Sequence, residues 1–387
     1  MKHRLAERMQ HISAFQVMAL LQRAKQLEQQ GRDVIHMEIG EPDFPTPPAI
    51  IAAGQRCISS GEVKYTPAAG LPELRAAIAD FYQQRYQVEV DPRRIIVTPG
   101  ASGAFLLGFG VSLNPDQQIM MADPCYPCNE NFLRLYQARA QYLPVNAETA
   151  FQLNADLIQR HWQTATAGVL IASPSNPTGT VLSDFELAAA IQAVHAQGGL
   201  FYSDEIYHGL VYEQSITTAL SFSDQVFVMN SFSKYFGMTG WRIGWLVVPD
   251  AFAEAAERLA QTVFIATPTH SQYAALAAFS PDNLAELDRR RDVFKQRRDF
   301  LYQNLSRLGF KIDAVPQGAF YLYADCSRFS ENSYQFAQDL LETEAVAVTP
   351  GIDFGHNQAN TRIRFAYTAS IDRMAAAINR LEHFICR

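Results

Sequence analysis

The sequence lacks the features that mark secreted, membrane-spanning and nucleic-acid-binding proteins. No run of apolar residues is long enough to cross a bilayer. The segment from Met1 to Gln30 has basic residues but neither the sustained apolar core nor the cleavage site of a secretion signal. Positive charge is in deficit, because the formal net charge is −7, and no basic stripe is present to neutralise nucleic-acid phosphates. We therefore expect a cytoplasmic protein with neither a membrane nor a nucleic-acid partner.

Cysteine is also scarce, with 5 in 387 residues. Cys125 and Cys128 have a C-x-x-C spacing that could form a redox pair or half of a zinc site. No second pair or matching histidines accompany them, and Pro124 and Pro127 predict a turn. We interpret the two cysteines as incidental thiols that flank Tyr126, and we expect no metal.

The length and an apolar fraction of 48% permit a large core and more than one domain. Between Ile50 and Pro249, short apolar strands alternate with helical patterns, which predicts an α/β protein with a doubly wound, mostly parallel sheet. Residues 284–308 then read as one long charged helix, followed by strands near 320–324 and 362–367 and helices near 333–343 and 372–384. Arginines 289–291, 297 and 298 alternate with aspartates, which predicts a solvated helix face.

The most informative segment places Lys234 directly after the apolar run 226–229. Ser231, Ser233 and Arg242 lie within a few residues and could hold a phosphate beside the lysine amine. Pyridoxal phosphate would satisfy both groups, because its aldehyde condenses with an amine and its ring withdraws electrons from the adduct. The alternative is a solvated loop lysine beside a surface arginine, which is the usual fate of either residue alone.

Two upstream strands decide between these interpretations. The apolar run 167–172 leads into a turn that contains Asn176, and the run 199–203 ends at Asp204. Alone, each residue has an ordinary structural explanation, as a turn residue or a helix cap. Because the carboxyl ends of strands in an open α/β sheet share one crevice, the sequence predicts that Asn176, Asp204 and Lys234 converge.

Further motifs run almost from end to end of the chain, and with them the sequence resembles the pyridoxal-phosphate-dependent aminotransferases of class I/II and fold type I, near the aspartate and kynurenine aminotransferases. The resemblance implies a large cofactor-binding domain over 46–280 and a smaller α/β domain, built from 1–45 and 281–387, that closes over the substrate. The motifs that carry it are residues 39–44, 65–67, 70–75, 123–127, 316–321, 350–355 and 362–366.

The resemblance implies a role for each residue around the cofactor ring. Lys234 would bind the cofactor aldehyde and later carry the proton between the substrate α-carbon and the cofactor. Asp204 would pair with the pyridine nitrogen and keep it protonated. Tyr207, with Asn176 as its companion, would donate a hydrogen bond to the cofactor O3′, and Tyr126 would lie over the ring.

The cofactor phosphate and the substrate carboxylate would each have their own set of ligands. Main-chain amides of Ala101 and Ser102, in a glycine-bearing turn before a helix, would join Ser231, Ser233 and Arg242 at the phosphate.

Arg364 would grip the substrate α-carboxylate with a two-pronged hydrogen bond. Gly40 would approach the same carboxylate through its backbone. Arg362, two residues away on the same expected strand, would point to the opposite face and be solvated. Tyr65 would reach the phosphate of a neighbouring subunit, which implies a homodimer with shared active sites.

The function implied is ping-pong transamination between an L-amino acid and a 2-oxo acid, alternating between pyridoxal and pyridoxamine phosphate. A C–S β-lyase or another enzyme of the same fold is the alternative, although lyase relatives commonly carry histidine where Tyr207 stands. A ligand sensor fused to a DNA-binding module is disfavoured by the acidic charge and by a fold that begins within the first few tens of residues. The donor side chain stays open, because Phe15, Gln16, Phe44 and Tyr321 could line a pocket or belong to the core.

Overall fold

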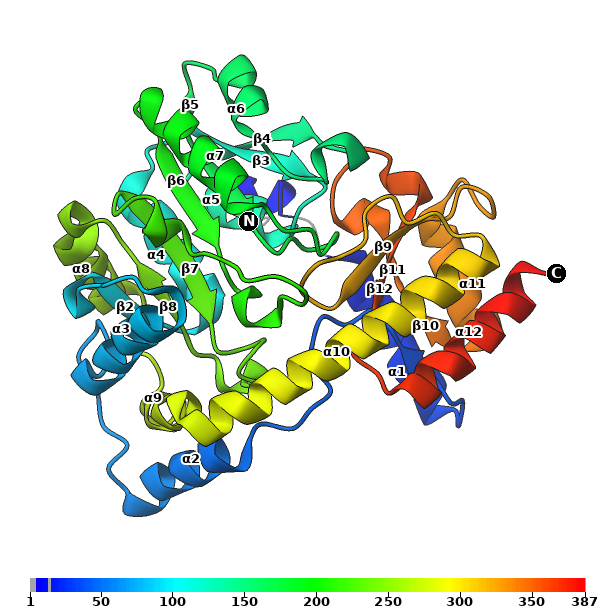
Figure 1. Cartoon of the computed structure of the whole chain (residues 1–387), viewed down its shortest axis with the longest axis horizontal. Helices are drawn as coiled ribbons and strands as arrows, with labels where there is room; N and C mark the ends of the chain where they lie inside the picture. The colour runs from blue at the N-terminus through cyan, green and yellow to red at the C-terminus, as the bar shows by residue number, and fades with distance from the viewer. Residues whose placement is uncertain (1–4, 13–14, 387) are drawn as a thin grey trace, which may run out of the picture.

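The computed structural model describes residues 5–12 and 15–386 and shows an α/β fold in which a large sheet and two small ones are covered by helices (Figure 1). The strands are β1 (Ile35–His36), β2 (Ile95–Thr98), β3 (Gln118–Asp123), β4 (Arg139–Pro144), β5 (Thr166–Ala172), β6 (Leu200–Asp204), β7 (Val226–Ser231), β8 (Gly244–Val247), β9 (Tyr321–Asp325), β10 (Val346–Ala347), β11 (Thr349–Pro350) and β12 (Arg362–Ala366). The α-helices are α1 (Gln16–Gln29), α2 (Pro48–Ser60), α3 (Pro72–Tyr86), α4 (Gly100–Ser112), α5 (Cys128–Leu135), α6 (Ala155–His161), α7 (Asp184–Ala196), α8 (Ala253–Val263), α9 (Thr269–Leu276), α10 (Pro281–Leu308), α11 (Ser333–Glu344) and α12 (Ile371–Ile385).

The large sheet has seven strands in the order β2-β8-β7-β6-β5-β3-β4. Only β8 runs antiparallel to its neighbours, so the prediction of a mostly parallel sheet is confirmed. The three central strands are in register at their carboxyl ends, where Ala172 pairs with Asp204 and Asp204 pairs with Met229. This register brings the residues that follow β5, β6 and β7 to one edge of the sheet.

The central strands are almost continuously buried because helices cover both faces of the sheet. On one face, α4 and α8 enclose a core with Phe109, Tyr202 and Phe227. On the other face lies α7, which begins with a capping box in which Ser183 and Glu186 satisfy each other's backbone amides. The capping box satisfies the first turn of α7, and burial on both faces holds the central strands in place.

The two chain ends meet beside the large sheet. Strand β1 pairs parallel with β10, and β11-β12-β9 form an antiparallel sheet. In Figure 1 the blue helix α1 lies among the orange and red elements α11, α12 and β12, and α1 contacts both β11 and α11. Helix α10 leads from the large sheet to this region, with Pro281 in its first turn and Gly309, at φ 99°, ending it. None of the described helices is long and apolar enough to cross a membrane.

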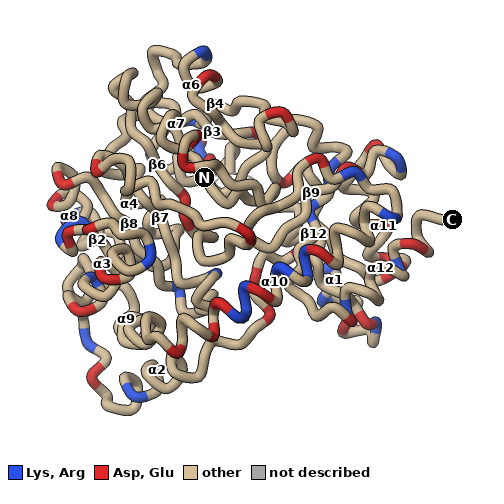
Figure 2. The backbone as a smooth tube through the Cα atoms, in the orientation of Figure 1, with Lys and Arg blue, Asp and Glu red and all other residues tan. Residues whose placement is uncertain are grey.

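The prediction of a solvated charged face on α10 is wrong for two arginines. Acidic and basic residues do alternate along this helix (Figure 2), and the Arg289 side chain is largely exposed. Arg297 and Arg298, however, are buried, because Arg297 forms a two-pronged pair with Asp43 at 2.7 and 2.9 Å and Arg298 pairs with Glu213. Arg298 also pairs with its neighbour Asp299, but Asp43 and Glu213 lie far away in the sequence, so the local charge pattern contains no sign of these two partners.

Candidate active site

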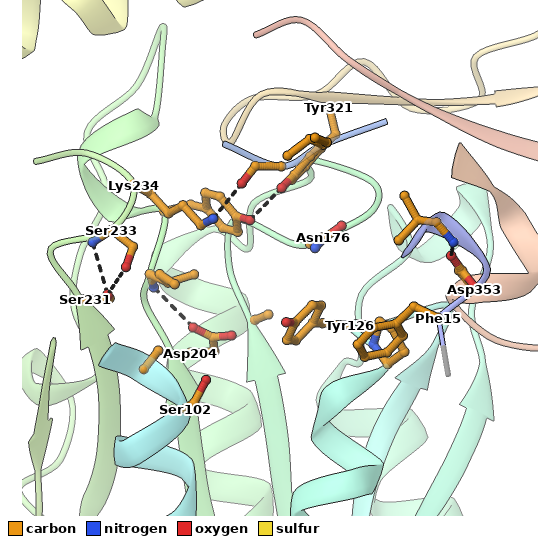
Figure 3. Close-up of a pocket in the computed structure, with 18 of the residues that line it drawn as sticks. Phe15, Ser102, Tyr126, Asn176, Asp204, Ser231, Ser233, Lys234, Tyr321 and Asp353 are labelled. Carbon is orange, nitrogen blue, oxygen red and sulfur yellow. Dashed lines mark hydrogen bonds between the residues drawn. The ribbon is translucent and has the colours of Figure 1, made fainter. Parts of the chain in front are cut away.

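A cavity of about 360 Å³ opens at the carboxyl ends of β5, β6 and β7, and segments from both chain ends complete its wall (Figure 3). This volume lies within the usual range for small-molecule sites. Most of the residues singled out in the sequence meet here: Gly40, Ala101, Ser102, Tyr126, Asn176, Asp204, Tyr207, Ser231, Ser233, Lys234, Arg242 and Arg364. Tyr65 is absent from the wall and is 84% exposed.

Lys234 follows β7 and extends its amine into this cavity. Its Nζ donates a hydrogen bond to the carbonyl oxygen of Gly40 at 2.6 Å. The pKa of Lys234 is lowered to about 8, chiefly by burial. The carboxylates of Glu41 and Asp204 oppose this shift, and the cations Arg364 and Arg242 add to it. A lysine with this pKa has a substantial neutral fraction near neutral pH, which is the form that attacks a carbonyl.

Asp204 ends β6 and is 6% exposed. Its Oδ1 accepts a hydrogen bond from the backbone amide of Ile206 at 3.2 Å. Burial raises the pKa of Asp204 to about 7, although this hydrogen bond and the charge of Lys234 favour the ionised form. A carboxylate with few partners in a buried place is suited to pair with a cation that enters the cavity.

Hydroxyl and guanidinium groups gather between the end of β7 and the start of α4. The Ser231 hydroxyl donates to the Ser233 hydroxyl at 2.9 Å, and Nη1 of Arg242 lies 3.5 Å from the same Ser233 oxygen. Gly100 begins α4 at φ 70°, and a Cβ there would lie 2.6 Å from Nη2 of Arg242. Glycine thus lets the guanidinium pack against the amino end of α4, where Ala101 and Ser102 line the cavity. Such a helix end favours an anion.

Arg364, on β12, occupies another part of the wall. Its Nη1 donates to Oδ1 of Asn176 at 2.9 Å and its Nη2 to the carbonyl oxygen of Glu38 at 2.5 Å. The guanidinium lies over the rings of Tyr321 and Phe354, at 4.2 and 4.8 Å from their centroids. Its buried Nε has no hydrogen-bond partner among the described residues. The guanidinium is therefore rigidly held and keeps a donor for a ligand carboxylate.

Aromatic hydroxyls and a thiol form further contacts in the cavity wall. The hydroxyls of Tyr207 and Tyr321 lie 2.9 Å apart. A Cβ on Gly40 would lie 2.1 Å from the Tyr321 hydroxyl, so glycine is required there by the tyrosine. The thiol of Cys128 donates to the Tyr126 hydroxyl at 3.0 Å.

Across residues 5–12 and 15–386, no group of three histidine, cysteine, aspartate or glutamate side chains could hold a metal ion.

Comparison with known families shows to which family the chain belongs. Residues 32–381 match the family described as aminotransferase class I and II. The chain belongs to this family. The family match covers nearly the whole length of the aminotransferase, and the resemblance inferred from the motifs is confirmed.

Relatives of this aminotransferase carry different substrate names. It is 36% identical over 372 residues to a valine–pyruvate aminotransferase of Mycobacterium tuberculosis, covering 96% of each chain, and 32% identical over 384 residues to an aspartate aminotransferase of Thermotoga maritima, covering 98% of this chain and 99% of the other. A crystal structure of an aminotransferase from M. tuberculosis superimposes with a TM-score of 0.96 at 35% identity and full coverage of both chains. The fold class predicted from the sequence is confirmed.

One expectation about a side chain of the aminotransferase is wrong, and the structure also answers the question left open between pocket and core. Arg362 does point away from Arg364, but it is 4% exposed rather than solvated, because its Nη1 lies 2.6 Å from a carboxylate oxygen of Asp313. Phe44 does not line the cavity and instead packs edge-on against Phe294 at 5.4 Å. Of the other candidates for the wall, Phe15 and Tyr321 line the cavity and Gln16 does not.

Asp353 is a feature of the site that the sequence analysis did not single out. It belongs to a short 3₁₀ helix, Gly351–Asp353, in one of the quoted motifs. Its two carboxylate oxygens accept hydrogen bonds at 2.7 Å from the backbone amides of Gln16 and Val17 at the start of α1. The motif was a signal that this segment matters, but nothing local in the sequence indicates a contact across 337 positions.

Proposed function

We propose that this aminotransferase binds pyridoxal phosphate through Lys234 and transfers an amino group from an L-amino acid to a 2-oxo acid by a ping-pong mechanism. The observation that carries the proposal is the convergence, in one cavity, of the Lys234 amine, the Asp204 carboxylate and the anion-binding corner around Arg242. When bound, this cofactor supplies an aldehyde that takes up amino groups and a ring that accepts electrons from the substrate α-carbon.

The residues present fit that cofactor at each of its polar ends. Ser231, Ser233 and Arg242, with the amino end of α4, would hold the phosphate, since hydroxyls, a guanidinium and free amides are the usual phosphate ligands. Asp204 would hold a proton on the pyridine nitrogen, because burial leaves its carboxylate in need of a cation. Tyr207 and Asn176 would donate to O3′, and Tyr126 would cover the ring.

Lys234 and Arg364 would then act on the substrate. We propose that Arg364 holds the α-carboxylate and so fixes the α-carbon near the Lys234 amine. Because burial lowers its pKa, this amine would act first as a general base, which takes the proton from the α-carbon, and then as a general acid, which delivers that proton to the cofactor. The carbonyl oxygen of Gly40, which accepts a hydrogen bond from Lys234, would hold the amine in position between the two proton transfers.

The proposed function also includes closure of the two domains over the substrate and assembly of a homodimer. Lys234 belongs to the proposed large domain, 46–280, whereas Gly40 and Arg364 belong to the proposed small domain, 1–45 with 281–387. Binding of the substrate carboxylate would draw the two together and exclude water. Tyr65, which is 84% exposed on a single chain, is available to reach the phosphate site of a second copy in a homodimer.

An assay of half-reactions tests the proposed function against its alternative. Incubation of the loaded enzyme with an amino acid alone should release one equivalent of oxo acid and then stop until a second oxo acid is added. A β-lyase would instead release pyruvate and ammonia continuously from cystathionine with no oxo acid present. Continuous release of that kind, without transfer to 2-oxoglutarate or pyruvate, would overturn the proposal.

The lysine pKa gives an expected pH dependence for cofactor capture. Because the neutral amine is the nucleophile, the rate of capture by cofactor-free protein should rise about tenfold per pH unit below the Lys234 pKa of about 8 and level off above it. Stopped-flow absorbance between pH 6 and pH 9.5 measures this rate. A profile that keeps rising toward pH 10 would show that Lys234 titrates as an ordinary solvated lysine.

Replacement of Arg364 by lysine should raise KM for the amino acid and the oxo acid alike, by about tenfold or more, because lysine keeps the charge but loses the planar fork. The visible absorbance of the bound cofactor should be unchanged, since the proposed contact is with substrate. Arg373→Lys is a matched control, because Arg373 lies on α12 and pairs with Asp33 at the surface. An unchanged KM in the Arg364 variant would rule out this assignment.

A further inference from the structure

The wall of the cavity farthest from the proposed phosphate corner is formed by the first helix of the chain. Phe15, Val17, Met18 and Leu21 contribute to this wall from the start of α1. In Figure 3 Phe15 lies beside Tyr126 on the side of the cavity opposite Ser231 and Ser233. A substrate anchored between Lys234 and Arg364 would therefore direct its side chain toward a surface of apolar groups.

The charged groups of the described cavity wall are already engaged. The cations are Lys234, Arg242 and Arg364, and each has a place in the proposed function. This leaves no cation of the described wall to pair with a side-chain carboxylate, and an unpaired charge placed against apolar groups is costly.

Among the acids that line the wall, two others besides Asp204 have partners of their own. Glu38 is fully buried, and its Oε1 accepts from Nδ1 of His36 at 2.7 Å. Its Oε2 has no hydrogen-bond partner among the described residues, so apart from Asp204, which the proposed function assigns to the cofactor, it is the acidic group of this wall that could attract a basic side chain. Asp353 is committed to the amides of α1.

Asp353 fixes the position of this wall. Helix α1 begins without a side-chain cap of its own and with no acidic residue in its first turn. The Asp353 carboxylate replaces both, because it accepts from the amides of Gln16 and Val17 and places negative charge at the positive end of the helix dipole. Burial raises the pKa of Asp353, and the two hydrogen bonds favour its ionised form. The wall residues Phe15, Val17 and Met18 thus belong to the segment that Asp353 holds in place.

We propose that α1, held at its amino end by Asp353, forms an apolar pocket wall that makes this aminotransferase select amino donors with uncharged, apolar side chains of about the size of leucine, methionine or phenylalanine. This inference rests on the proposed function and adds its donor class. Asp353 is a positioning residue, since it acts through α1.

A donor panel tests the class directly. With 2-oxoglutarate and pyruvate as acceptors, kcat/KM for leucine, methionine and phenylalanine should exceed kcat/KM for aspartate and glutamate by at least about tenfold, and should exceed that for lysine and ornithine likewise. A preference for dicarboxylic donors would overturn the inference and leave transamination intact. A preference for basic donors would do the same and would point to Glu38. If no donor is turned over, the proposed function itself fails.

Asp353→Ala tests the positioning role. The ratio of kcat/KM for leucine to that for alanine should fall about tenfold, because the wall touches only the longer side chain, and amide hydrogen exchange at residues 16–21 of the cofactor-free protein should accelerate. Asp353→Asn, which keeps one acceptor oxygen, should show a smaller change. Asp184→Ala is the matched control, because Asp184 is an exposed acid in the first turn of α7. An unchanged ratio with accelerated exchange would assign Asp353 to structure alone and overturn its positioning role.

Met18→Arg provides a second variant in case the loss of Asp353 impairs folding. Met18 is 54% exposed, so a longer side chain can be accommodated at this position. A cation on the wall should shift the ratio of kcat/KM for glutamate to that for leucine upward by about tenfold or more. No shift would show that this face of α1 does not meet the donor side chain.

Discussion

Lys234→Ala is expected to reduce kcat by about 10⁴-fold or more and to abolish the visible absorbance band of the bound cofactor. Two tasks depend on the same amine, namely capture of the cofactor aldehyde and movement of the proton at the substrate α-carbon. Its contact with the Gly40 carbonyl at 2.6 Å and its pKa of about 8 suit both. Steady-state transamination and an absorbance spectrum of the purified variant measure the two effects separately.

Lys25→Ala is the control for this experiment, because Lys25 is an exposed lysine on α1 and should leave both readouts unchanged. Retention of the absorbance band by the Lys234 variant would mean that another amine captures the cofactor. Loss of the band with turnover retained would separate the two tasks and refute proton transfer by Lys234.

The convergence at the sheet edge could be predicted from the sequence because it depends on local signals. Parallel strands buried on both faces appear as continuous apolar runs, and the first polar residues after such runs lie at one edge of the sheet. Asn176, Asp204 and Lys234 were placed together in this way, and all three line the cavity. The roles assigned to them come from the family resemblance and are open to the experiments described above.

The sequence could not reveal contacts between distant polar groups. Arg298 reads as a surface charge because acidic and basic residues alternate around it, and Arg362 because it was expected to point to the face opposite Arg364. In the fold, Asp313 is buried with Arg362, whereas Glu213 stays about half exposed and pairs with the buried Arg298 from a distant segment; both carboxylates offset the cost of burying a guanidinium. Asp353 and the start of α1 form a further case, since the helix shows an apolar pattern but its cap comes from the other end of the chain. Patterns of period 2 or 3.6 specify elements and faces, whereas pairings of single charges depend on the completed topology.

Asp204→Asn is expected to have two effects of opposite sign. The rate of transamination should fall by about 10³-fold, because an amide cannot hold a proton on the pyridine nitrogen and the cofactor then withdraws electrons poorly. Glu205→Gln is a matched control, because burial raises the pKa of Glu205 to about 7 as well, yet its carboxylate accepts from Thr218 and Ala219 and does not line the cavity. That variant should keep kcat within a few-fold, and an equal loss in both variants would refute a specific role for Asp204.

The second effect is a gain in the stability of the cofactor-free protein, and its pH dependence follows from the Asp204 pKa. The folded-state pKa is about 7 against an ordinary value of 3.8, so the folded protein binds this proton more tightly than the unfolded chain does. The stability that this proton provides is present below pH 4 and is lost as the pH rises to about 7, at a total cost of at most roughly 4 kcal/mol. Asparagine stays neutral and avoids this loss, so the free energy of unfolding of the variant should exceed that of the parent by about 1–4 kcal/mol at pH 8 and by little at pH 4.

Urea titrations of both proteins at the two pH values measure the difference. Equal stability at pH 8 would show that the carboxylate is well solvated in the empty cavity, and would remove the physical reason for its pairing with a cationic ring.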